Sequence, residues 1–553
     1  MYYSVDSFFV SVCLYERKTR IPMITLFTNG KIYSPGTGFT GSFAVCDDRF
    51  CELPCGVTPD RVVDLGGQFV CPGFTDTHLH LAGYGRALLS CDLADHTGSL
   101  SEMLSYMRDF LAEHPAQNGS WLFARGWNED LFSDVHRPVT RQDLDTVSTE
   151  VPIYAGRTCG HLVCVNTKAL EVMGVTAKTE APEGGRIGIE NGELTGMFYD
   201  NALNLIRKSM PRPDVATIKK YILAACEKLN SFGVTGAMTD DFTLVYRWEN
   251  VTKAYRELEQ EGKLSVRIYQ QCYFDEPEKL KEFRNAGNLF GSGSDLYRIG
   301  PLKMIDDGAV GAHTAYLSEP YADIPETRGS FVYSQETLDE MISLANRHDT
   351  QVAIHAIGDA CLDMVLDAYE KAYREHPWKD IRHTLIHCMV TRPDQFARIR
   401  DLGLRVHYQT VFLDYQCRIA EARLGKERAS HSYAWKTMKD MGIPTSNSSD
   451  APVEIPAPLR GMQLAVTRQP LDQSTPPLSP NEAFSVEEAI AGYTTDAVAA
   501  SFDENKKGRI LPGFLADFVV LSENPFETDP QDIASIKVTQ TWMGGKQVYT
   551  LPL

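Results

Sequence analysis

Two histidines one residue apart, His78 and His80, are the first residues whose spacing suggests metal chemistry. They stand at the end of an apolar run that covers residues 69–78. In a β-strand, residues i and i+2 point to the same side, so the two imidazoles can hold one cation together. A pair of structural histidines fits the same pattern, and further residues are needed to decide.

Four more residues with suitable side chains lie in or at the ends of other apolar runs. They are Lys303 in PLKMIDDG, His355 ending VAIH, His387 ending TLIH, and Asp450 ending TSNSSD. Imidazoles and carboxylates are typical zinc ligands. An unmodified ammonium has donors only, so Lys303 is either chemically modified or not a ligand. Six such residues at strand-like positions indicate a metal centre.

The elements that must position these residues form an alternating pattern of apolar runs and amphipathic helical stretches. The eight runs cover 69–78, 233–240, 266–274, 298–308, 352–359, 384–388, 405–409 and 443–450. This alternation is typical of a parallel sheet with crossover helices. Eight strands close a TIM-type (β/α)8 barrel, whose active sites lie at the carboxyl ends of the strands. The predicted fold class is therefore α/β, in the form of a TIM-type (β/α)8 barrel.

Shorter β-rich segments flank this barrel at both ends of the chain. We expect residues 23–70 and 500–553 to form one composite β-sandwich, and residues 71–499 to form the barrel. The stretch at about 91–205 is too long for one crossover helix and is interpreted as an insertion after the first barrel strand. Residues 1–22 precede the first strand-like run and are interpreted as an N-terminal extension.

Composition narrows the class of partner. The chain has 553 residues and a formal net charge of -19, which argues against binding nucleic acid or anionic membranes. No apolar run reaches the roughly 18 residues of a membrane span. The 13 cysteines are scattered without CxxC spacing, as expected for reduced thiols in a cytoplasmic protein. We therefore expect a small-molecule substrate.

Several longer motifs identify a family. They include PGFTDTHLHL, GWNEDLF, RTCGHLVCVNTKAL, LKMIDDGAVGAHTA, VAIHAIGDACLDMVLDA, SSDAPVEIPAPLRGMQLAVTR and KGRILPGFLADFVVL. In these stretches the chain resembles the amidohydrolase superfamily, in the YtcJ-like (amidohydrolase 3) branch that includes N-substituted formamide deformylase. The motifs extend from about residue 24 to the C-terminus, so the resemblance covers nearly the whole chain.

This resemblance implies a site with two divalent metal ions, expected to be zinc. His78, His80 and Asp450 would hold one ion, and His355 and His387 the other. Lys303 matches the lysine that is N6-carboxylated in related barrels and bridges both ions. A metal-bound hydroxide would then attack the carbonyl of an amide-type, non-peptide C–N bond. Asp450 would act as general base and then as general acid.

Other reactions remain open at this stage. The same centre could serve a deaminase, a cyclic-amide hydrolase, or an enzyme that cleaves phosphotriesters or lactones. A non-catalytic scaffold relative is a further alternative, but it predicts eroded ligands, and all six positions are intact. The sequence does not identify the substrate, and a homodimer is only the default expectation.

Further polar and aromatic residues are candidates for weaker roles. Trp127 is either a lid aromatic that touches substrate or a core residue, and Arg157 and His161 either line the pocket or brace the insertion. His313 follows the fourth run and is a candidate substrate contact. Asp359 either holds His355 in orientation by accepting a hydrogen bond from its ring, or begins the next helix. Asp306 and Asp307 are interpreted as structural, and Ile386 and Cys159 depart from the usual family pattern.

Overall fold

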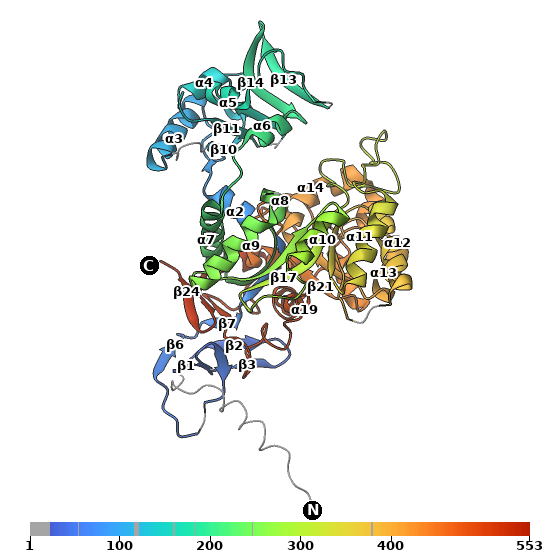
Figure 1. Ribbon diagram of the computed structural model, residues 1–553. Coiled ribbons are helices and arrows are strands. Elements are labelled where there is room, and N and C mark those ends of the chain that lie inside the picture. Colours follow the sequence, from blue (N-terminus) through green and yellow to red (C-terminus); the bar gives the residue numbers. More distant parts are fainter. Residues whose placement is uncertain are drawn as a thin grey trace, which may run out of the picture. The chain divides into compact units, whose positions relative to one another are not determined.

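The computed structural model describes residues 23–53, 55–115, 121–158, 161–182, 184–245, 247–377 and 380–552. The proposed extension at 1–22 and the family departure Cys159 lie outside these residues. The chain divides into two compact units (Figure 1). The first, here called the barrel unit, comprises the described residues within 1–81, 226–243 and 255–553, and the second, the insertion unit, those within 82–225 and 244–254.

Eight parallel strands form the central sheet of the barrel unit. In spatial order they are β8 (Phe74–Leu79), β15 (Val234–Asp240), β16 (Arg267–Tyr273), β17 (Tyr297–Ile305), β18 (Val352–Ala356), β19 (Thr384–His387), β20 (Arg405–Tyr408) and β21 (Thr445–Asn447). Their interiors are almost entirely buried, which explains why they appear as continuous apolar runs. The predicted α/β barrel is confirmed.

The two ends of this strand order meet through backbone hydrogen bonds. The amide of Asp450 donates to the carbonyl of His78 over 2.8 Å, and the amide of His80 donates to the carbonyl of Ala451 over 2.7 Å. The turn after β21 is thereby joined to the end of β8. In the sequence, Asp450 follows His78 and His80 by about 370 residues. Closure of the barrel therefore places Asp450 beside these two histidines.

The first apolar run contains two strands that belong to different sheets. Residues Phe69–Pro72 form β7 in the β-sandwich, and β8 of the barrel begins at Phe74. Gly73 lies between them, where a Cβ atom would stand 2.4 Å from the Thr235 hydroxyl. A single strand over 69–78 is therefore replaced by two strands, because the chain crosses from one sheet to the other at this glycine.

Helices follow the barrel strands along the chain (Figure 1). They are α10 (Pro277–Asn285), α11 (Gln335–Arg347), α12 (Asp359–Glu375), α13 (Pro393–Asp401), α14 (Leu413–Leu424), α15 (Lys426–His431), α16 (Trp435–Asp440), α17 (Pro458–Thr467), α18 (Val486–Tyr493) and α19 (Thr495–Ala499). Helices α7 (Val215–Ser231) and α9 (Trp248–Gln260) each contain residues of both units. None of the helices in the described residues is both long and apolar enough to cross a membrane.

Both ends of the chain build the small β-sandwich, as predicted. One sheet contains β1 (Ile24–Thr28), β4 (Phe43–Cys46), β5 (Arg49–Cys51) and β6 (Arg61–Asp64), and the other contains β2 (Lys31–Ser34), β3 (Gly38–Thr40), β7, β22 (Phe518–Leu521), β23 (Val538–Met543) and β24 (Lys546–Thr550). Strand β22 pairs antiparallel with β7. Between the sheets, the Phe27 ring packs edge-to-face on Phe518 and on Trp542, with centroids 5.1 Å apart in both pairs. Phe518 and Trp542 stack on one another, with centroids 5.5 Å apart.

The insertion unit has its own mixed sheet. Its strands are β9 (Cys91–Asp92), β10 (Leu122–Trp127), β11 (Ile153–Arg157), β12 (Leu162–Val165), β13 (Gly185–Glu190) and β14 (Glu193–Asp200). Its helices are α2 (Leu81–Leu88), α3 (Leu100–Glu113), α4 (Arg141–Asp145), α5 (Thr167–Met173) and α6 (Leu203–Ser209). Two apolar clusters form its core, so this unit buries its own hydrophobic surface.

Candidate metal centre

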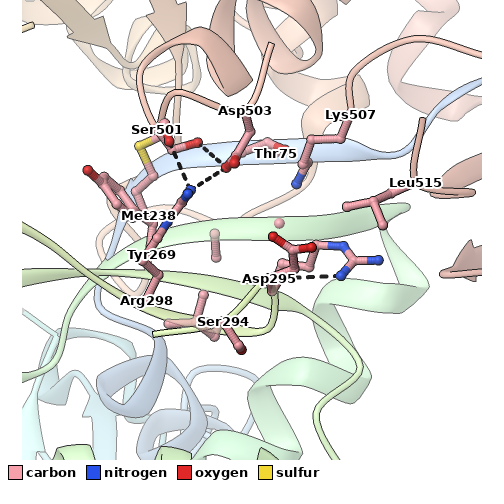
Figure 2. Close-up of a pocket in the computed structure, with 14 residues that line it drawn as sticks. Thr75, Met238, Tyr269, Ser294, Asp295, Arg298, Ser501, Asp503, Lys507 and Leu515 are labelled. Carbon is pink, nitrogen blue, oxygen red and sulfur yellow. Dashed lines mark hydrogen bonds and ion pairs between the residues drawn. The ribbon is translucent and has the colours of Figure 1, made fainter. Parts of the chain in front are cut away.

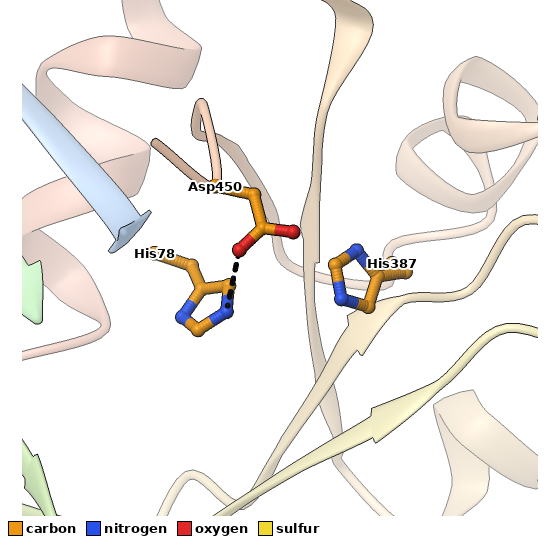
Figure 3. Close-up of side chains that lie close together, drawn as sticks. All are labelled: His78, His387 and Asp450. Atoms are coloured by element: carbon orange, nitrogen blue, oxygen red, sulfur yellow. Dashed lines mark ion pairs between the residues drawn. The ribbon is translucent and has the colours of Figure 1, made fainter. Parts of the chain in front are cut away.

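Three side chains converge at the carboxyl ends of the barrel strands (Figure 3). His78 comes from β8, His387 ends β19, and Asp450 follows β21; their ligand atoms all lie within 4.8 Å of one another. His387 and Asp450 have left-handed backbone conformations, with φ values of 79° and 59°. Non-glycine residues adopt such conformations at a cost, and they gather at functional sites.

His80 joins this group through Asp450. Nε2 of His78 and Nε2 of His80 each lie 3.3 Å from Oδ1 of Asp450. Both rings therefore direct the same nitrogen toward one carboxylate oxygen, as the alternation of side chains in β8 requires. Two imidazoles and a carboxylate in this arrangement supply three ligands for one cation.

The opposite nitrogens of these imidazoles are fixed by hydrogen bonds. Nδ1 of His78 lies 2.8 Å from Oε1 of Gln271, and Nδ1 of His80 lies 2.8 Å from the carbonyl oxygen of Asp240. Because these oxygens only accept, each Nδ1 carries the proton and donates it. Nε2 is then the nitrogen of each ring that is available to bind a metal ion.

His387 provides a test of whether a metal ion fits. Its Nδ1 donates to Oε1 of Gln409 over 2.7 Å, while its Nε2 is buried without a hydrogen-bond partner. A buried acceptor without a partner is costly, and a divalent cation would satisfy it. The described residues therefore fit a metal ion at this position.

Burial and neighbouring charges set the protonation of these rings. Burial, together with the Lys303 ammonium, lowers the pKa of His78 to about 3, and burial holds the pKa of His387 well below its ordinary value. Burial also opposes the charged form of His80, but the carboxylates of Asp450 and Asp240 outweigh it and raise its pKa to about 9. A divalent cation bound by His80 would replace the proton that the raised pKa keeps on this ring.

His355 uses its nitrogens differently. Its Nε2 lies 3.1 Å from the carbonyl oxygen of Gly308 and 3.3 Å from Oδ1 of Asp307. Donation from Nε2 leaves Nδ1 as the atom that can bind a cation. The ring centroid lies 4.3 Å from that of His387. His355 and His387 are therefore neighbours at the carboxyl ends of adjacent strands.

Lys303 lies in β17 and is almost completely buried, with 1% of its surface exposed. Burial lowers its pKa to about 8, although the carboxylates of Asp240 and Asp450 favour the charged form. Asp240 itself is fully buried, and its Oδ2 has no hydrogen-bond partner. Lys303 is thus held inside the barrel with Asp240 and Asp450 as its principal charged neighbours.

The residues that orient the histidines were not identified from the sequence. Gln271 and Gln409 bind His78 and His387, Asp240 binds His80 through its carbonyl group, and Asp307 approaches His355. The feature of the sequence that could have identified them is a polar side chain inside or directly after a buried strand. Such a side chain must find a hydrogen-bond partner in the barrel, although its sequence position does not say which one.

For two residues the sequence left alternatives open, and the structure agrees with the structural alternative in each case. Asp359 begins α12, and its carboxylate accepts from the amide of Ser318 over 2.9 Å and from Arg392 over 3.1 Å, while Asp307 lies next to His355. Trp127 does not offer a surface to substrate. It is fully buried in the core of the insertion unit, where its indole nitrogen donates to Ala155.

The other candidate substrate contacts have local partners. Arg157 pairs with Glu129 over 2.6 Å and Asp130 over 2.9 Å within the insertion unit. His161 is exposed, with Nδ1 3.3 Å from Asp200. In the barrel unit, Nε2 of His313 lies 3.1 Å from Asp323 and its ring packs on Tyr321. A substrate role for Arg157, His161 and His313 stays a prediction.

A parallel barrel with imidazoles and a carboxylate gathered at the carboxyl ends of its strands is the arrangement expected of metal-dependent barrel hydrolases. The model of the amidohydrolase family matches residues 61–549, and the chain belongs to this family. It is 33% identical to the putative amidohydrolase YtcJ of Bacillus subtilis, over 92% of this chain and 93% of that protein. The resemblance to the YtcJ-like branch is thereby confirmed.

Two further relatives agree with this membership. The chain is 26% identical to the N-substituted formamide deformylase of Arthrobacter pascens, over 89% of this chain and 91% of that protein. The crystal structure of an uncharacterized metal-dependent hydrolase from Pyrococcus horikoshii matches with a TM-score of 0.76 at 26% identity, covering 92% of this chain and 99% of that one.

Proposed function

We propose that the protein hydrolyses an amide-type, non-peptide C–N bond in a small molecule with the help of bound metal ions. The observation that supports this most strongly is the orientation of three histidines. Nε2 of His78 and of His80 both face Asp450, and Nε2 of His387 is buried beside them without a partner. The similarity to a deformylase that acts on N-substituted formamides supports the amide-type bond.

The proposed centre holds two divalent ions, for which zinc is the best candidate. His78, His80 and Asp450 would bind one ion, and Nδ1 of His355 with Nε2 of His387 the second. Lys303, carboxylated on Nζ, would bridge them, because an unmodified ammonium cannot bind a cation. When bound, the ions would lower the pKa of a water molecule and polarise the carbonyl group of the substrate.

Asp450 is the residue proposed to move protons. Its carboxylate lies at the centre of the group, within 3.3 Å of two imidazoles, and it can accept a proton from the attacking water. The same carboxyl group then gives that proton to the departing nitrogen. Water and the amide are thereby converted into a carboxylic acid and an amine. Gln271 and Gln409 keep the imidazoles in the orientation that this geometry requires.

Elemental analysis and product analysis together test this proposal. We expect about two equivalents of zinc or a similar ion per chain, and release of an amine and formate or another carboxylate from a panel of N-substituted amides. Ammonia as the product would instead identify a deaminase, and a single ring-opened product would identify a cyclic-amide hydrolase. A protein that retains no metal after growth with added zinc would overturn the proposal and favour the non-catalytic scaffold.

A further inference from the structure

A second polar site lies in the barrel unit, at the amino ends of the strands (Figure 2). It is a cavity of about 30 Å³. Thr75, Gly236, Arg267 and Arg298, which lie near the starts of β8, β15, β16 and β17, form one wall. Residues of the C-terminal segment 501–515 form the other. His78 lies near the opposite end of β8, so this cavity is separate from the candidate metal centre.

Most charged groups at the cavity are paired with one another. Arg267 donates to both carboxylate oxygens of Asp517, over 2.7 and 2.9 Å. Arg298 binds Asp503 over 2.5 Å. The remaining lining carboxylate, Asp295, pairs with Lys506 over 3.0 Å. Each of these carboxylates is therefore neutralised by its own cation.

Lys507 is the remaining cation. It is 95% buried, since only 5% of its surface is exposed. Among the described residues, no carboxylate lies within 4.0 Å of its Nζ, and its side chain makes no hydrogen bond. In Figure 2 its side chain reaches toward the space beside Thr75. The carboxylates of Asp517 and Asp503 act on Lys507 from beyond ion-pair distance, and each is already paired with an arginine. Lys507 therefore has no ion-pair partner of its own among the described residues, which is unfavourable in a buried site.

Other polar atoms at the cavity also lack partners. Oγ1 of Thr75 and Nε of Arg298 are both buried without a hydrogen bond. A Cβ atom on Gly236 would stand 2.5 Å from Nζ of Lys507 and 2.8 Å from Oγ1 of Thr75. The ammonium and the hydroxyl thus lie close together over this glycine. Three groups that can donate hydrogen bonds therefore line one small cavity.

We propose that this cavity binds a single small monovalent anion of the chloride type. The anion would neutralise Lys507 and accept hydrogen bonds from the ammonium and from Thr75. A water molecule needs about 10–15 Å³ of such space, so the cavity has room for a monatomic ion and is too small for phosphate or a metabolite carboxylate. Because the cavity joins the barrel strands to segment 501–515, the anion would stabilise that junction.

Bromide, which scatters anomalously, is the direct probe. We expect crystals of the metal-loaded protein soaked in sodium bromide to show one anomalous peak within hydrogen-bond distance of Nζ of Lys507. Water density alone at that position, with no bromide peak, would overturn the proposal. This result does not depend on catalysis or on the metal centre, so it is distinguishable from failure of the proposed function.

Thermal unfolding gives an independent measurement. At constant ionic strength, replacing gluconate by chloride should raise the Tm of the wild-type protein by roughly 2 °C. Lys507→Met should remove this chloride dependence, whereas Lys537→Met, at an exposed position that does not line the cavity, should keep it. If Lys507→Met does not fold, Thr75→Val provides the second variant, for which we expect a weaker bromide peak. An equal chloride effect in wild type and Lys507→Met would contradict the assignment.

Discussion

Gln409 fixes the orientation of His387. Its Oε1 accepts a hydrogen bond from Nδ1 of His387 over 2.7 Å, while its Nε2 donates to Ser448 over 2.8 Å. The imidazole therefore cannot turn without breaking a buried hydrogen bond, and its Nε2 faces Asp450 and His78. Gln271 does the same for His78 from the other side of the barrel. Two glutamines thus prepare two histidines for metal binding.

The first prediction concerns these glutamines. Gln409→Leu and Gln271→Leu should each weaken metal binding by about 10- to 100-fold, because the freed imidazole loses its orientation and its fixed tautomer. Metal affinity is measured by competition with a chelator of known strength. Gln270→Leu is the matched control, since Gln270 is equally buried but donates its hydrogen bonds to the backbone carbonyls of Thr239 and Gln271. Equal losses in all three variants would indicate general destabilisation instead.

The second prediction concerns Asp450. Asp450→Asn should lower kcat by roughly 10²- to 10⁴-fold, because an amide cannot transfer the proton. Metal content should fall less than activity, since the histidines remain in place. Steady-state kinetics on the best amide substrate and elemental analysis of the same preparation check both statements. An unchanged kcat would remove Asp450 from the proposed mechanism.

The third prediction concerns Lys303. If its Nζ is carboxylated, protein prepared with ¹³C-bicarbonate should show a carbamate carbon signal by NMR, and Lys303→Met should lack it. The variant should also bind about one metal equivalent fewer, because the bridging group is lost. A wild-type protein with two metal equivalents and no carbamate signal would show that another group bridges the ions.

The fourth prediction concerns the buried pair of Arg267 and Asp517, which links β16 to the start of β22. Arg267→Met should reduce the free energy of unfolding by about 3–5 kcal/mol at pH 7, because Asp517 is left buried and charged without its ion-pair partner. Urea unfolding of both proteins measures this difference. The exposed pair of Lys506 and Asp295 is the control, and Lys506→Met should cost less than about 1 kcal/mol.

The effect of pH on this pair has a definite sign. Burial acts to raise the pKa of Asp517, but Arg267 outweighs it and holds the pKa below its ordinary value. The stabilisation is therefore complete above the unfolded pKa of about 3.9 and is lost as pH falls through the lower folded pKa. The difference between wild type and Arg267→Met should shrink below about pH 4. A difference that grows on acidification would contradict this assignment of charges.

Much of the site followed from one regularity in the sequence. Polar residues that end buried strands must lie at one edge of a parallel barrel, and this places His78, His387 and Asp450 together before any coordinates are known. The same rule does not select among neighbouring carboxylates. Asp359 and Asp307 are both close to His355 in the chain or the sheet, and only the path of the loop after β17 decides that Asp307 approaches it.

By itself, the sequence determined the barrel, the two-ended β-sandwich and the identity of the candidate ligands. These depend on local patterns, namely apolar runs, their alternation with helices, and polar residues at strand ends. The tertiary structure decided which nitrogen of each imidazole faces the site, which groups hold it there, and that Lys507 is buried without an ion-pair partner among the described residues. These facts depend on contacts between residues far apart in the chain. Gln271 and His78, for example, are 193 residues apart in the sequence, and no local sequence pattern predicts the hydrogen bond between them.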